Sequence, residues 1–326
     1  MELLRKLTET DAPSGRENSI CEFIKNEAVS LGYDVTIDSL GSVIAHRKGS
    51  GKKLMIAAHT DEIGVIVNFI DDNGFIRFAA VGGLDTKELM KRRVRFSNGT
   101  VGIISAEEKA FEEKAELGKM YIDIGAKDRE TALEKVSIGD MAVFCGDFYQ
   151  NGDTVISKAL DDRAGCYIML KAMAQIPECK NDIYFVFTAQ EEVGLRGSKT
   201  SAFSVMPDIA IAIDVTDVGD TPDAAKSDVR IGGGAAIKVM DRSVLCDRGV
   251  VSTLRELAQV NKIPYTSEIM TEGGTDAGAI ALTGAGVKAG GISVPVRYIH
   301  SPSELASIND INDCIRLLKA ACEFEW

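Results

Sequence analysis

Four short apolar runs constrain most strongly how this chain can fold. They are Lys53–Ala58, Asp182–Ala189, Ile209–Asp214 and Gly291–Val296. An uninterrupted apolar strand is typical of the buried middle of a parallel or mixed sheet, because helices cover both of its faces. Apolar residues at helical spacing predict helices near residues 17–31, 161–176, 250–261 and 308–322. Ser14 or Gly15 is expected to cap the first helix. The pattern therefore predicts an α/β/α fold built around a mixed sheet.

The middle of the chain has a different texture, from about residue 67 to 157. Three Asn-Gly pairs lie there between strand-like runs: Asn73-Gly74, Asn98-Gly99 and Asn151-Gly152. Asn-Gly favours a tight hairpin, because both residues tolerate positive φ. Two polar segments, 105–117 and 127–136, are expected to form short helices. We predict a discontinuous α/β domain, residues 1–66 plus 158–326, that carries an inserted small β-barrel-like domain at 67–157.

Composition restricts the partners and the compartment. The 37 basic and 49 acidic residues give a net charge of −12, which argues against nucleic acid and anionic membranes, because binding phosphates needs a basic face. No apolar run reaches the roughly 20 residues of a membrane span, and the first 15 residues lack the apolar run of a secretory signal. The seven cysteines are odd in number and show no CxxC spacing, as expected for reduced thiols in the cytoplasm.

Histidines and carboxylates recur at the ends of the predicted strands. His59 ends one strand and His300 follows another, whereas His46 lies at a charged strand end and is expected at the surface. Glu191, Glu192 and Asp214 lie at such places too, and Asp161 opens a predicted buried helix. The carboxyl ends of strands in an open α/β sheet share one crevice. So much buried negative charge needs cations, and mixed His and carboxylate ligands suit Zn²⁺, Co²⁺ or Mn²⁺.

Six segments, taken in order, resemble the M42 metallo-aminopeptidases, dinuclear enzymes of the zinc-exopeptidase group. They are Ala57–Gly64 (AAHTDEIG), Lys158–Gly165 (KALDDRAG), Ala189–Gly197 (AQEEVGLRG), Ile213–Thr216 (IDVT), Gly273–Ala277 (GGTDA) and Arg297–Glu304 (RYIHSPSE). The opening Ala12–Glu17 (APSGRE) is also similar to the family's entry into its first helix. The segments span nearly the whole chain.

The resemblance implies a role for each candidate residue. Asp161 would bridge two divalent metals, Zn²⁺ or Co²⁺; His59 and Asp214 would complete one site, and Glu192 and His300 the other. Glu191 would be the general base and Asp61 would hold His59. The inserted β domain would serve assembly into a homo-oligomer such as a dodecamer, and the substrates would be peptides. Chemistry agrees, since paired metals lower the pKa of a water that a carboxylate can deprotonate.

Some features depart from the family pattern and leave alternatives. The inserted part lacks a Pro-Pro-His element, Gly232–Ala236 stands where Gly-Lys-Gly-Pro is frequent, and Asp162 stands where Asn is frequent.

Two alternative functions remain open: a related zinc hydrolase that acts on another amide bond, and a scaffold protein without activity. A glycosidase with two carboxylates would leave both histidines without a role. Loops near Gly232–Ala236 and Gly273–Ala277 are expected to form the substrate pocket.

Overall fold

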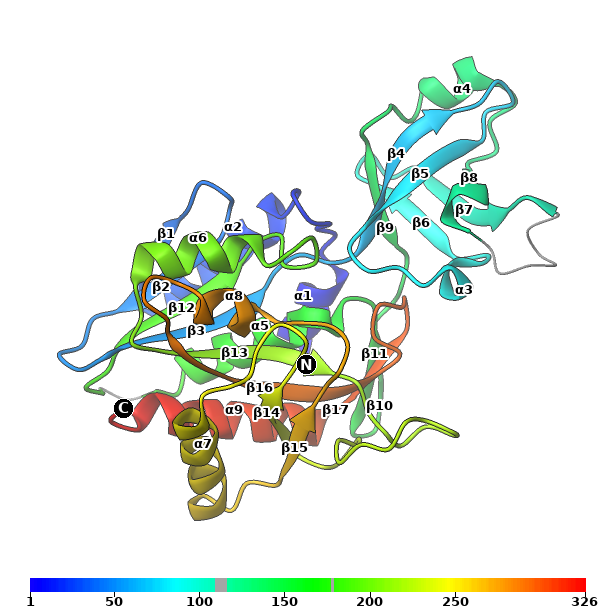
Figure 1. The fold of residues 1–326 in the computed structure, drawn as a ribbon. Coiled ribbons are helices and arrows are strands. Elements are labelled where there is room, and N and C mark those ends of the chain that lie inside the picture. The colour runs from blue at the N-terminus through cyan, green and yellow to red at the C-terminus, as the bar shows by residue number, and fades with distance from the viewer. Residues whose placement is uncertain (109–115, 177–178) are drawn as a thin grey trace.

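The computed structural model describes residues 1–108, 116–176 and 179–326, and its largest element is an 11-stranded mixed sheet (Figure 1). The four predicted strands form its centre: β12 (Asp182–Thr188), β3 (Lys53–His59), β13 (Ile209–Thr216) and β16 (Lys288–Arg297). They lie side by side in this order and are parallel. The predicted mixed-sheet α/β class is confirmed.

Antiparallel strands extend this parallel centre on both sides. One edge carries β2 (Val43–Arg47) and β1 (Asp34–Ile37). The other continues through β17 (Glu304–Ser307), β11 (Thr154–Ser157) and β10 (Tyr149–Asn151). In a branch of the sheet, β14 (Ala235–Met240) pairs with β16, and β15 (Tyr265–Ile269) pairs with β14.

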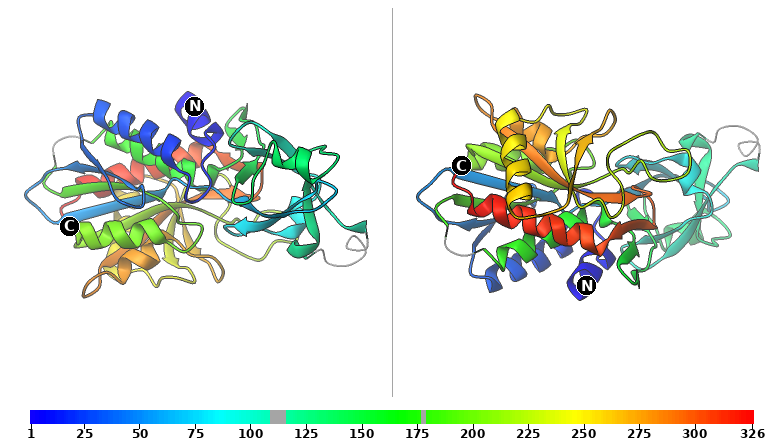
Figure 2. Two further views of the ribbon diagram at one scale, coloured as in Figure 1. Left: turned by 90° about the horizontal axis from the view of Figure 1, so that it is seen from above. Right: turned by 90° about the horizontal axis from the view of Figure 1, so that it is seen from below.

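Helices cover both faces of the sheet, as Figure 2 shows. One face packs against α1 (Glu2–Glu9), α2 (Asn18–Ser30), α5 (Leu160–Met173) and α9 (Ile308–Glu323), with α7 (Arg248–Val260) beside α9. The opposite face packs against α6 (Arg196–Val205) and α8 (Asp276–Ala281). Alternate residues of β3 enter the two resulting cores, Leu54 and Ile56 on one side and Met55 and Ala57 on the other. This two-sided burial explains why its sequence is apolar without interruption.

The inserted segment forms a closed six-stranded barrel beside the sheet (Figure 1). Its strands are β4 (Gly64–Ile70), β5 (Ile76–Val81), β6 (Arg93–Phe96), β7 (Val101–Ala106), β8 (Met120–Asp123) and β9 (Met141–Phe144). Short helices α3 (Thr86–Leu89) and α4 (Arg129–Leu133) accompany them. The barrel has its own apolar core, which includes Val65, Val94 and Ile104. By strand membership, β10 and β11 belong to the large sheet, although they lie within the predicted insertion limits of 67–157.

All three Asn-Gly pairs lie in hairpin turns, but the two residues of each pair do not both have the positive φ that was expected. Only the glycines have positive φ: 84° at Gly74, 88° at Gly99 and 61° at Gly152. At Gly99 the N–H donates to the carbonyl of Phe96 (2.9 Å), and the Phe96 N–H donates to the carbonyl of Thr100 (2.9 Å). The glycine therefore takes the left-handed position of a longer turn. Of the two predicted polar helices, residues 129–133 form α4, whereas 105–117 begins in β7 and then lies largely outside the described residues.

A chain of ion pairs joins the barrel to the sheet. Arg95 in β6 binds both oxygens of Asp11 (2.8 Å each). Asp11 also lies 3.2 Å from the Nζ of Lys158, whose ammonium donates to both oxygens of Glu62 (2.8 and 2.6 Å). Arg163 approaches the same glutamate at 3.6 Å. These charges are arranged with alternating sign, so each buried group has a partner.

The fold also bears on the expectations for Ser14, His46, the cysteines and membrane-spanning helices. Ser14 does not cap α2; its hydroxyl donates to Asp61 (2.6 Å) instead. His46 is half-buried, bonded to Asp182 (2.8 Å) and stacked on Tyr184. The seven cysteines are free thiols. Within the described ranges, no helix is both long and apolar enough to cross a bilayer.

Candidate metal centre

The sheet brings the predicted ligands together at the carboxyl ends of its parallel strands. His59 is the last residue of β3, Asp214 lies near the end of β13, and Glu191 and Glu192 follow β12. Asp161 opens α5, and His300 follows β16. All six side chains line one cavity of about 510 Å³: His59, Asp161, Glu191, Glu192, Asp214 and His300. This is the crevice that parallel strands form for ligands.

Two groups of side chains in this cavity could each hold a metal ion. His59, Asp161 and Asp214 form one group, and Asp161, Glu192 and His300 form the other; within each, the ligand atoms lie within 4.8 Å of one another. Asp161 belongs to both: its Oδ1 is 2.9 Å from His59 Nε2, and its Oδ2 is 3.2 Å from His300 Nε2. His300 Nε2 is also 3.2 Å from Glu192. A carboxylate shared in this way has the geometry of a bridging ligand.

The electrostatics of the cluster favour added positive charge. Burial raises the pKa of Asp214 well above its usual range, and nearby Asp161 raises it further. Burial would lower the pKa of His59, but hydrogen bonds with Asp161 and Asp61 raise it well above normal. The pKa of Asp161 stays below its usual range despite burial, because both histidines contact it. A buried cluster with this excess of carboxylates is suited to divalent cations of the zinc type.

Asp61 is fully buried and contacts three of the residues that line the cavity. Its carboxylate accepts the backbone N–H groups of Glu191 (3.0 Å) and Glu192 (3.2 Å) and lies 3.5 Å from His59 Nδ1. The hydroxyl of Ser14 donates to it as well. Burial would raise the pKa of Asp61, but the His59 contact, the Ser14 hydroxyl and the Glu191 N–H lower it. An ionised Asp61 therefore orients the imidazole and the pair of glutamates together.

Glu191 lines the cavity and, like Asp217 and Glu272, belongs to neither ligand group. Its Oε2 lies 4.0 Å from His59 Nε2. Burial raises the pKa of Glu191 well above its usual value, and Asp214 and Asp276 raise it further, whereas His59 lowers it. A carboxyl with a raised pKa in a cavity is suited to exchanging protons near neutral pH.

Four buried residues lie in or beside the recognised segments, but their supporting roles were not predicted from the sequence. Glu304 accepts the backbone N–H groups of Asp161 and His300. Asp162 accepts the N–H of His59 (3.2 Å). Thr188 donates to Asp276 (2.5 Å). Apart from the contact of Glu304 with His300, each of these contacts joins residues at least 88 positions apart in the sequence. Most of them therefore cannot be predicted from spacing along the chain.

The cavity walls only partly match the expected loops. Gly273, Gly274 and Thr275 line the cavity with Val215, Met270 and Ile299, but none of Gly232–Ala236 does. That loop is instead bonded to Asp310 on α9 through the N–H groups of Gly232 and Gly234. The expectation that it shapes the pocket is therefore wrong.

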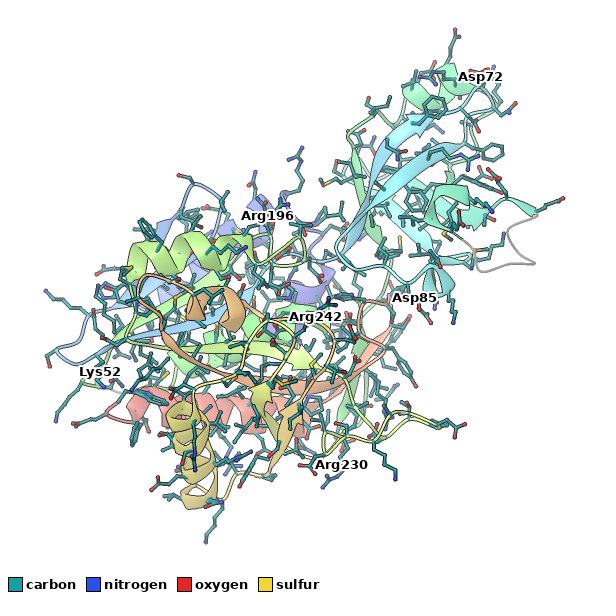
Figure 3. All side chains as sticks on the ribbon, in the orientation of Figure 1. Lys52, Asp72, Asp85, Arg196, Arg230 and Arg242 are labelled. Atoms are coloured by element: carbon teal, nitrogen blue, oxygen red, sulfur yellow. The ribbon has the colours of Figure 1, made fainter. Side chains whose placement is uncertain are left out.

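The barrel also contributes to the cavity. Gly83, in the segment after β5, lines the wall, and a Cβ there would be 3.0 Å from His300 Nδ1. Asp85 marks this end of the barrel in Figure 3, and Asp72 marks the opposite end. Arg242, also labelled, pairs with the cavity residue Glu272 at 3.5 Å.

Known proteins resemble this chain over most of its length. Residues 41–317 match the family described as M42 glutamyl aminopeptidase. The chain belongs to the M42 peptidase family. A protein of Acetivibrio thermocellus is 54% identical over 321 residues, which cover 98% of this chain and 97% of the relative.

Two solved M42 structures share the whole fold. An aminopeptidase from the archaeon Desulfurococcus kamchatkensis aligns with a TM-score of 0.94 and 40% identity, over 99% of this chain and 94% of its own. The TET1 peptidase of Pyrococcus horikoshii, described as assembling into a tetrahedron or a large octahedral shell, aligns with a TM-score of 0.90 and 33% identity, over 100% and 99% of the two chains. The predicted family resemblance is thus confirmed.

Proposed function

We propose that this M42 protein is a dinuclear metallo-aminopeptidase that hydrolyses the N-terminal residue from peptides. Two divalent ions, Zn²⁺ or Co²⁺, would bind at the two ligand groups that share Asp161. The sharing of this one carboxylate between two histidine-containing groups is the observation that carries the proposal. When bound, such a pair supplies a Lewis acid for the scissile carbonyl and lowers the pKa of a water.

The protein's own residues divide the remaining work. Glu191, free of either ligand group, is placed to accept a proton from the attacking water and then to donate it to the leaving amine. Asp61 positions Glu191 through its backbone N–H and orients His59 at Nδ1. The apolar wall of Val215, Met270 and Ile299 is placed to receive the substrate's first side chain and to exclude water.

The same account includes an assembly and a compartment. We propose a homo-oligomer in which the barrel supplies contacts between copies, supported by the assembled state of the similar TET1 peptidase. The seven free thiols support a cytoplasmic location, because such a compartment keeps cysteines reduced.

Two measurements test the reaction. Aminoacyl-p-nitroanilides should be cleaved by the wild type, and an acetyl-blocked peptide should resist it. Cleavage of the blocked peptide at a similar rate would favour a hydrolase of other amides. Glu191→Gln keeps the size of the side chain but cannot accept the proton, so kcat should fall by at least about 10²–10⁴-fold while metal content is unchanged. A fully active Glu191→Gln enzyme would end this mechanism.

A further inference from the structure

Glu304 binds the backbones of two candidate metal ligands at once. Its Oε2 accepts the N–H of Asp161 (3.0 Å), and its Oε1 accepts the N–H of His300 (2.9 Å). The residue is 2% exposed and belongs to neither ligand group. Both of its oxygens face the protein backbone, so its structural task differs from that of the five candidate ligands.

The topology explains why one residue can reach both ligands. Glu304 is the first residue of β17, which lies between β16 and β11. Its position is held by pairing with Ser157, the last residue of β11. The chain leaves β11 through residues 158–160 to reach Asp161, and leaves β16 through 298–299 to reach His300. The two ligand-bearing segments therefore depart from the two strands that flank Glu304.

These departing segments need external support, because their backbones contain unfavourable conformations. Ala159 has φ of 53°, Tyr298 has φ of 63° and His300 itself has φ of 61°. A non-glycine residue in this left-handed region is held there only when surrounding contacts require it. The N–H bonds to Glu304 supply such contacts at the two residues that carry ligand atoms.

We infer that Glu304 is a positioning residue that sets the spacing between Asp161 and His300 and so keeps the Asp161–Glu192–His300 metal site formed. This inference rests on the proposed dinuclear function. His300 has no other support of this kind from an acidic side chain in the described residues, whereas His59 is also held by Asp61 and Asp162. Loss of Glu304 should therefore weaken the binding of the metal ion at the Asp161–Glu192–His300 site far more than the binding of the other ion.

Glu304→Gln is the variant of choice, because an amide has one acceptor oxygen and would turn its NH₂ towards one of the two N–H groups. Asp310→Asn is the matched control. Asp310 is 1% exposed and also accepts two backbone N–H groups, from Gly232 (2.7 Å) and Gly234 (2.8 Å), but these residues lie outside the cavity lining. In each variant a buried carboxylate that accepts two backbone N–H groups becomes an amide. In Glu304→Gln those N–H groups belong to candidate metal ligands, and in Asp310→Asn they do not.

Zinc titration of chelator-stripped protein, followed by calorimetry, measures each affinity without reference to catalysis. The wild type should bind two ions. In Glu304→Gln one affinity should fall about 10–100-fold while the other stays within about threefold. In a His300→Ala background, Glu304→Gln should weaken that same site less than it does in the wild type. Asp310→Asn should bind both ions as the wild type does. If Glu304→Gln does not fold, Glu304→Asp, which withdraws both oxygens by one methylene, should weaken the same ion.

The possible failures are distinct. A wild type that binds no zinc overturns the proposed function itself. A wild type with two ions and a Glu304→Gln or Glu304→Asp variant with the same two affinities overturns only the positioning role. Equal metal loss in Glu304→Gln and Asp310→Asn also overturns it, because the effect would then be general destabilisation.

Discussion

Replacing Lys158 by methionine tests the ion-pair chain that lies between the barrel and the metal centre. Lys158 is 2% exposed, and its ammonium binds Glu62 at 2.6 Å and Asp11 at 3.2 Å. Methionine keeps the length and apolar stem of the side chain but removes the charge. Glu62 would then be a buried carboxylate with the Ala12 N–H (2.9 Å) and the more distant Arg163 (3.6 Å) as partners.

Breaking a buried ion pair from one side costs about 3–5 kcal/mol, because the remaining charge is left uncompensated. The residual cation Arg163 places the expected loss in the free energy of unfolding at about 3 kcal/mol, the low end of that range. Adding Glu62→Gln should recover part of this loss, since the unpaired charge is then gone. We expect a coupling energy of about 2 kcal/mol between the two changes, within the range for residues in contact.

Urea unfolding followed by far-UV circular dichroism gives these values, and Lys180→Met is the matched control. Lys180 and Glu325 lie at the same 2.6 Å separation, but the two side chains are 67% and 65% exposed. An exposed pair contributes less than about 1 kcal/mol, so the control should unfold almost as the wild type does. A Lys158→Met protein no less stable than Lys180→Met would refute the argument that burial makes this pair costly to break.

Three other outcomes follow from the site and the family. Asp61→Asn should lower kcat about 10–100-fold, because its amide cannot accept every bond that orders Glu191 and Glu192; wild-type turnover in steady-state assays would contradict this. Glu192→Gln removes an anionic ligand, so activity lost in metal-free buffer should return in part as Zn²⁺ is added, whereas loss that no metal restores would count against a ligand role. Light scattering should report a mass several-fold above the 35.0 kDa chain, and a monomer at micromolar concentration would exclude the oligomer.

The strands were predictable from the sequence because burial on both faces leaves a local signature. β3, β12, β13 and β16 are apolar along most of their length, and their charged residues come at or near the ends. Four of the five candidate ligands were found for the same reason, since each lies at or near such an end, whereas Asp161 was found at the start of a buried helix. The branch of β14 and β15 was missed: β15 alternates between buried and half-exposed positions in a short segment, TSE, and pairs mainly with β14.

The supporting contacts were not predictable in the same way. Glu62, Asp162 and Glu304 lie inside the recognised segments, but only the fold shows which distant N–H or ammonium group donates to each of them. Ser14 illustrates the reverse case, because its position before a helix predicted a cap, yet its hydroxyl binds Asp61 across the fold. Tertiary hydrogen bonds compete with local ones for the same side chain.

Metal content measured together with activity tests the central claim most directly. Elemental analysis of active protein should find two transition-metal ions per chain, one for each ligand group around Asp161. Exhaustive chelation should remove the ions and the peptidase activity together, and added Zn²⁺ or Co²⁺ should restore both. Active protein that contains no transition metal, or that keeps its rate after chelation, would contradict the account.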